Sequence, residues 1–203
     1  RGSNRLTNFA LVNRLSYFLW SSMPDEELIA LAQAEDLRRP DVLVRQVRRM
    51  LKDDRARALA IEFAGNWLDF RQFQNHVAVV RTKFPQFTDE LRESMFQEPV
   101  YFISDLIRRD GSVRELLEAG HTYVDKNLSE HYQIPYAADA ADENGWLRVD
   151  NARAYGRGGL LPMSVFLTKS SPGLRTSPVK RGYWIVKQLL GERIPAPPPD
   201  VPE

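Results

Sequence analysis

Cysteine is absent from all 203 residues. Its absence excludes disulfide bonds, thiolate metal ligands, a cysteine nucleophile and the CxxCH motif that attaches haem c covalently. Histidine is scarce, with three residues in the chain. The spacing between His121 and His131 matches no compact zinc pair such as HxxxH. We therefore expect no metal site, and no cofactor held by this segment itself.

Neither sign of charge dominates the sequence. Lys and Arg number 28 and Asp and Glu number 27, which gives a net charge of +1. No field of the whole chain would attract nucleic acid or an anionic membrane, so we expect no nucleic-acid partner. No run approaches 18 consecutive apolar residues, which excludes a transmembrane helix. The first residues contain no signal-peptide core, so we expect the chain to be a piece of a longer protein, with any export signal upstream or already removed.

Helical periodicity runs through most of the chain and predicts a mainly α-helical fold. The composition, 43% hydrophobic and 27% charged, is that of a chain that folds. We predict a multi-helix bundle followed by a smaller C-terminal helical module. The expected helices cover approximately residues 7–20, 24–37, 39–53, 53–70, 89–111, 112–120, 126–132 and 177–191.

Three local features of these helices can be stated in advance. Leu59, Phe63 and Trp67 follow one helical face and predict an aromatic stripe in the bundle core. Pro99 falls inside a long helix, so we expect a kink or break just before it. Asp125 is placed to cap the short helix that ends near residue 132.

The character of the sequence changes after residue 135. A small, polar and acidic loop leads to "WLRVD", the one convincing short strand. The glycine-rich stretch "GRGGLL" lacks the spacing of a P-loop or a dinucleotide-binding turn. The last helix has Ser177 as its N-cap, Pro178 at its first position and Gly191 at its end. We predict modules at 7–135 and 156–194, joined by a loop with a strand at 136–155 and followed by a stiff Pro-rich linker at 195–203.

Seven blocks in this order resemble a known pair of domains. They are "RLSYFLWSSMPDEEL", "RQVRRMLKD", "FAGNWLDF", "YVDKNLSEHYQIP", "GRGGLL", "RTSPVKRGYWIVKQLLG" and "PAPPPDVP". The sequence resembles two adjacent domains of unknown function from large planctomycete-type proteins that also carry c-type cytochrome segments. The resemblance implies an exported, periplasmic or cell-surface protein, with haem c in an adjacent segment and a cytochrome c domain as the neighbouring partner. It assigns no activity.

Two groups of residues are candidate sites. Arg175, Thr176, Lys180 and Arg181 cluster at the start of the last helix, where they could form salt bridges between the modules or bind an anion. Their partner in the second case could be a haem propionate, a sugar acid, sulfate or phosphate. His131, beside Tyr132, could contact a haem held by another segment, or could be a hydrogen-bonded packing residue.

No catalytic constellation is evident, so the sequence leaves open whether the chain contributes to an enzyme. No GxSxG elbow is present, and the adjacent carboxylates lie in caps and loops. We expect a non-catalytic structural or docking module that orients a neighbouring haem domain in an electron-transfer context. The alternatives are part of the active site of a haem-dependent oxidoreductase, or a binding module for an acidic glycan or another anion.

Overall fold

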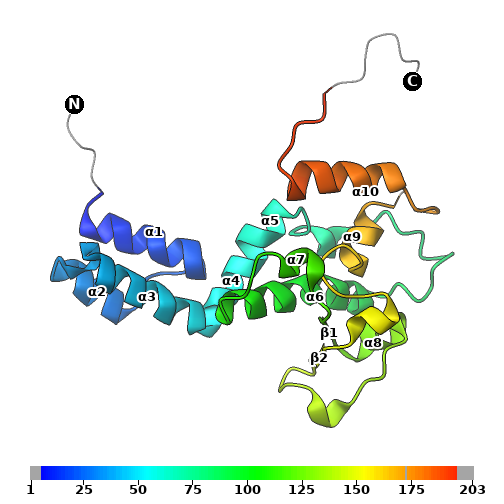
Figure 1. The fold of residues 1–203 in the computed structure, drawn as a ribbon, viewed down its shortest axis with the longest axis horizontal. Coiled ribbons are helices and arrows are strands. Elements are labelled where there is room, and N and C mark those ends of the chain that lie inside the picture. The colour runs from blue at the N-terminus through cyan, green and yellow to red at the C-terminus, as the bar shows by residue number, and fades with distance from the viewer. Residues whose placement is uncertain (1–5, 172, 196–203) are drawn as a thin grey trace. The chain divides into compact units, whose positions relative to one another are not determined.

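The computed structural model describes residues 6–171 and 173–195. Figure 1 shows its elements. The helices are α1 (Asn8–Trp20), α2 (Glu26–Gln33), α3 (Pro40–Lys52), α4 (Arg57–Leu59), α5 (Gly65–Trp67), α6 (Asp89–Arg108), α7 (Glu115–Glu118), α8 (Lys126–Tyr132), α9 (Ser164–Lys169) and α10 (Pro178–Trp184). Two π-helical segments, η3 (Ala60–Ala64) and η7 (Ile185–Leu189), follow α4 and α10. The prediction of a mainly α-helical fold is confirmed.

The chain packs into two compact units that interleave along the sequence. The first unit consists of the residues up to Ala64 together with Val100–Val113, and the second consists of Gly65–Pro99 together with the residues from Arg114 onward. The long helix α6 therefore supplies its second half to the first unit and its first half to the second. The module boundaries near residues 135 and 156 stay predictions. The predicted Pro-rich linker, apart from Pro195, lies outside the described residues.

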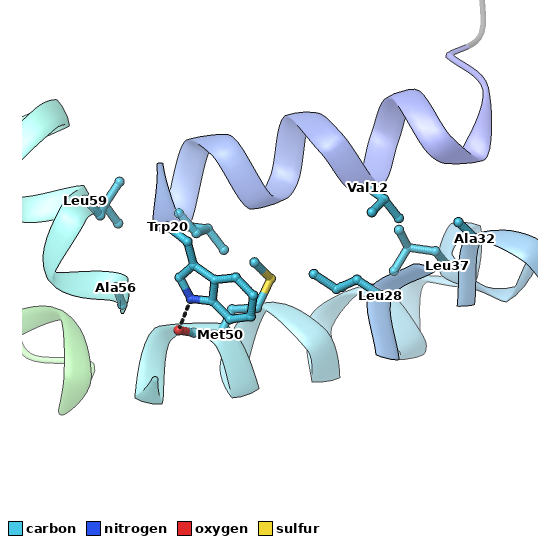
Figure 2. Close-up of a cluster of buried hydrophobic side chains, with 9 residues drawn as sticks. Val12, Trp20, Leu28, Ala32, Leu37, Met50, Ala56 and Leu59 are labelled. Atoms are coloured by element: carbon cyan, nitrogen blue, oxygen red, sulfur yellow. Dashed lines mark hydrogen bonds between the residues drawn. The ribbon is translucent and has the colours of Figure 1, made fainter. Parts of the chain in front are cut away.

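The first unit is built around the indole of Trp20. Helices α1, α2 and α3 contribute to a buried cluster that also includes Val12, Leu28 and Met50. The indole N–H of Trp20 donates a hydrogen bond of 2.9 Å to the carbonyl of Met50, which Figure 2 shows inside this cluster. The polar edge of the ring is thus satisfied while its apolar body is buried.

Charged side chains lie beside Trp20 and at the start of α2. The Arg55 guanidinium lies 3.5 Å from the centroid of the Trp20 ring. Arg49 pairs with Asp25 at 2.7 Å, and Asp25 also accepts the Leu28 N–H as the N-cap of α2. The hydrogen bond from Arg49 holds the pKa of Asp25 below its usual range. Asp25 therefore joins the start of α2 to the end of α3.

The second unit packs around aromatic rings and a short sheet. Phe70 makes edge-to-face contacts with Phe96 and Phe166, each with ring centroids 5.8 Å apart. The sheet pairs β1 (Thr122–Val124) with β2 (Leu147–Val149) in antiparallel register. The strand at 147–149 was predicted from the sequence, whereas the buried strand β1 was not.

Two sequence-based expectations can be compared with the structure. The helix α6 continues through Pro99 without the predicted break, whereas a kink at this residue stays a prediction. The second expectation is wrong. The predicted aromatic stripe does not form the core. The π turn of η3 shifts the buried positions by one residue along the sequence. Ala60, Ala64 and Leu68 are buried, as is Leu59, but Phe63 is 52% and Trp67 37% exposed.

Residue Asp25 provides a test of this arrangement. We predict that Asp25→Ala lowers the free energy of unfolding by about 1–2 kcal/mol, because it removes both the N-cap and the ion pair. Asp25→Asn, which keeps the capping oxygen, should cost less. Urea denaturation measures both variants against Asp54→Ala, which removes a fully exposed carboxylate and its exposed ion pair with Arg108. Equal losses for Asn and Ala at position 25 would contradict the capping role.

Candidate functional site

The second unit contains a pocket of about 340 Å³, which we call the Arg181 pocket. It brings together three of the residues singled out from the sequence: His131 from α8, Thr176 from the segment before α10, and Arg181 from α10 itself. These residues are separated by up to 50 positions in the chain. The remaining lining residues are Val79, Phe84, Gln86, Phe87, Leu91, Met95, Leu167, Thr168, Ser171 and Gly173.

The other candidate residues lie outside this pocket. Lys180 faces a separate hollow of about 470 Å³, where Lys169 and Lys187 also line the wall. Lys169 is paired there with Asp69 at 2.6 Å. Arg175 is exposed and lines neither hollow. Within residues 6–171 and 173–195 no ion pair is found at Arg175, Lys180 or Arg181, so salt bridging between the modules stays a prediction.

His131 stands at the last turn of α8, on the wall of the Arg181 pocket. The side chain is exposed on one side, and the protein around it lowers its pKa mainly by desolvation, with a smaller contribution from the positive charge of Arg157. The neutral imidazole is therefore favoured near pH 7, where it can both donate and accept a hydrogen bond.

Behind His131 lies a buried polar network centred on Glu98. The Glu98 side chain is completely buried. Its two oxygens accept hydrogen bonds of 2.6 Å from the hydroxyls of Thr122 and Tyr132. The Tyr132 oxygen in turn accepts the backbone N–H of Ser164 at 2.8 Å. This network connects α6, β1, α8 and α9, and so fixes the helix that carries His131.

Arg157 completes the surroundings of the network. Its guanidinium carbon lies 3.7 Å from the centroid of the Tyr132 ring, and its side chain donates to the carbonyl of Pro162. Burial raises the pKa of Glu98 to about 7, although the two hydroxyl donors and Arg157 act in the opposite direction. Burial and the adjacent Glu98 raise the pKa of the Tyr132 hydroxyl, so that it stays a donor.

Sequence reasoning identified Tyr132 but missed Glu98, Thr122 and Arg157. A signal for Glu98 was present, because positions 91, 95, 98, 102 and 106 follow one face of α6 and all but this one are apolar. A carboxylate within an apolar stripe indicates a buried, partnered group. No comparable signal marks Thr122 or Arg157.

The other two histidines lie in packing positions. His76 stacks on Phe73 with ring centroids 5.5 Å apart, and His121 is buried with its ring edge-on to Tyr123. No group of three or more His, Cys, Asp or Glu side chains could hold a metal ion in the part of the chain that the structure describes. In the same part, no helix has the length and apolar character needed to cross a membrane.

The glycine-rich stretch has a packing role in the structure. Gly158 has a φ of +111°, and a Cβ atom there would lie 2.5 Å from the carbonyl oxygen of Ala119. The neighbouring Leu160 N–H donates to Leu116 at 2.7 Å. The glycines thus let this loop lie directly against the end of α7.

Two family models match the chain. Residues 6–134 match the model described as PSD4, protein of unknown function (DUF1592). Residues 157–203 match the model described as PSCyt3, protein of unknown function (DUF1588). The first match alone covers well over half of the chain, and together the two confirm the resemblance to paired domains of unknown function. No curated protein and no solved structure gives a significant match.

The glycine-rich loop provides a matched pair of substitutions. We predict that Gly158→Ala lowers the free energy of unfolding by about 3 kcal/mol, because the methyl group collides with a backbone carbonyl at a positive φ. Gly156→Ala should cost only about 1 kcal/mol, since its φ is also positive but no atom lies within 4 Å of the added carbon. Chemical denaturation of both variants tests the difference; equal costs would contradict the close approach.

The buried carboxylate should make stability depend on pH. Because the pKa of Glu98 is about 7 in the folded chain and its ordinary value is 4.5, the folded state retains a proton that the unfolded state has lost. The contribution of Glu98 to the free energy of unfolding therefore falls by on the order of 3 kcal/mol as pH rises from 4.5 to 7. Above pH 7 this contribution is constant.

We predict that Glu98→Gln removes this fall. The unfolding free energy of the variant minus that of wild type should therefore become more positive between pH 5 and pH 8. His76 and His131 have lowered pKa values, which make stability rise with pH. Both proteins contain these histidines, so the difference between them reports Glu98 alone. Glu90→Gln, an exposed change on the same helix, is the control. A difference that does not change with pH would refute the assignment.

Proposed function

The chain belongs to the PSD4 family of proteins of unknown function (DUF1592), and on this premise we propose that it is a non-catalytic docking module that orients a neighbouring c-type cytochrome domain. The setting we propose is an exported, periplasmic or cell-surface protein that takes part in electron transfer. The name PSCyt3 of the second matching family supports the cytochrome context. The haem would be held by the neighbouring domain, because the present chain has no cysteine for covalent attachment.

The observation that carries the proposal is the exposed surface of residues 174–194. The helix α10 and the segment η7 contain no buried residue. Val179 is 82% exposed, and Tyr183, four residues later on the same side of the helix, is also exposed. We call this surface the C-terminal docking face; its members are the exposed apolar residues Leu174, Val179, Tyr183, Leu190 and Ile194 and the exposed cations Arg175, Lys180, Lys187 and Arg193.

The composition of this face indicates the kind of partner it suits. Exposed apolar residues that are grouped along one segment are typical of an interaction site. The interspersed cations favour a partner with carboxylates around an apolar patch, and they would increase the rate of association at low salt. A cytochrome domain offers such carboxylates in the propionates of its haem and in any acidic residues nearby.

The face is presented by a helix that is fixed from two directions. The Trp184 indole donates to the carbonyl of Leu68, and the Trp67 indole donates to the carbonyl of Gln188, each at 2.8 Å. The ring of Trp184 also packs against Phe166 with centroids 4.6 Å apart. These contacts hold α10 and η7 on the second unit while leaving their outer side chains exposed, which is what a docking helix requires.

Binding to the cytochrome domain tests the proposal. We predict that the 203-residue chain binds the purified c-type cytochrome domain of its parent protein, and that Val179→Asp with Tyr183→Ser weakens this binding at least about tenfold. Val77→Asp, on a residue that is 88% exposed outside the docking face, should leave it unchanged. Isothermal titration calorimetry at low and high salt gives the affinities. No binding by the wild type, or equal loss in the control, would contradict the proposal.

A further inference from the structure

The Arg181 pocket has the features of a small-molecule site, and we propose that it binds an amphipathic monocarboxylate: a small organic acid with an apolar body and one carboxylate group. This inference does not depend on the docking function. The pocket and the C-terminal docking face share no residue.

The inner wall of the pocket is apolar. Phe84, Phe87 and Met95 line it together with Leu91 and Leu167. The volume of about 340 Å³ lies at the lower end of the range for ligand pockets, which are mostly apolar with a few placed polar groups. Such a wall would stabilise the apolar body of a ligand by removing it from water.

The lining also contains polar groups. Arg181 is half-buried, and in the described part of the chain no ion pair or side-chain hydrogen bond is found for it. Thr168 and Thr176 add hydroxyl groups to the lining. An arginine can hold a carboxylate with two parallel hydrogen bonds, and a partly buried cation gains most from such a partner.

The charge balance of the lining favours one negative charge on the ligand. Arg181 is its one permanently charged residue, and no acidic side chain is among the residues that line the pocket in the described part of the chain. The imidazole of His131, neutral near pH 7, can donate a hydrogen bond without adding a second charge. A monocarboxylate therefore matches the site better than a dianion such as phosphate.

Three probes separate the elements of this proposal. Octanoate carries both the apolar body and the carboxylate, octan-1-ol carries the body alone, and inorganic phosphate carries charge alone. We predict that octanoate binds the 203-residue chain with a Kd of about 0.1–1 mM, whereas octan-1-ol and phosphate bind at least about tenfold more weakly. Calorimetry and ligand-observed NMR measure this.

Matched variants assign the binding to the pocket. Arg181→Gln should weaken octanoate binding at least about tenfold, and Arg181→Lys should restore part of it, because the charge returns without the planar fork. Arg175→Gln makes the same change in charge on an exposed residue outside the pocket and should have no effect. Circular dichroism confirms that each variant is folded.

Three outcomes would overturn the proposal: no binding of octanoate at about 10 mM, equal binding of octan-1-ol, or equal loss in Arg181→Gln and Arg175→Gln. The docking variant Val179→Asp with Tyr183→Ser should still bind octanoate. Failure of the docking function and failure of this site are therefore distinguishable.

Discussion

A carboxyl group removed completely from water needs hydrogen-bond partners inside the protein, and in this chain that requirement organises the second unit. Glu98 is such a group, and its donors come from β1 and α8, while the Tyr132 that serves it is itself held by the start of α9. Burying an acid without these partners would cost several kcal/mol. Segments up to 66 residues apart in the sequence are thereby joined at one point, and the wall of the Arg181 pocket is one result.

The proposed docking surface and the proposed ligand pocket use different sides of the C-terminal segment. Arg181 faces the pocket, whereas Val179 and the exposed cations belong to the docking face. The closing helix can therefore serve both roles without one side chain being required for two partners. Trp67 and Trp184 make this possible. The Trp67 indole donates to the backbone carbonyl of Gln188, and the Trp184 indole donates to the carbonyl of Leu68. Neither hydrogen bond uses Val179, Arg181 or the exposed cations.

Helix caps between residues close in the sequence could be predicted from the sequence, whereas contacts between segments far apart in the chain could not. Asp125 and Ser177 cap their helices as predicted, because a short polar side chain needs only the next three residues to do so. The exposure of Phe63 depends on a π turn, which arises from packing. The strand β1 consists of three buried residues without alternation, and its partner begins more than 20 residues later. Only the fold places His131 and Arg181 around one pocket.

The attachment of α10 also determines how independently the C-terminal segment can behave. A helix with no buried side chain of its own opens at a lower free energy than helices that carry the core. The indole hydrogen bonds of Trp67 and Trp184 and the ring contact of Trp184 with Phe166 oppose this opening. A helix that is already held in place loses less conformational entropy when a neighbouring domain docks on it.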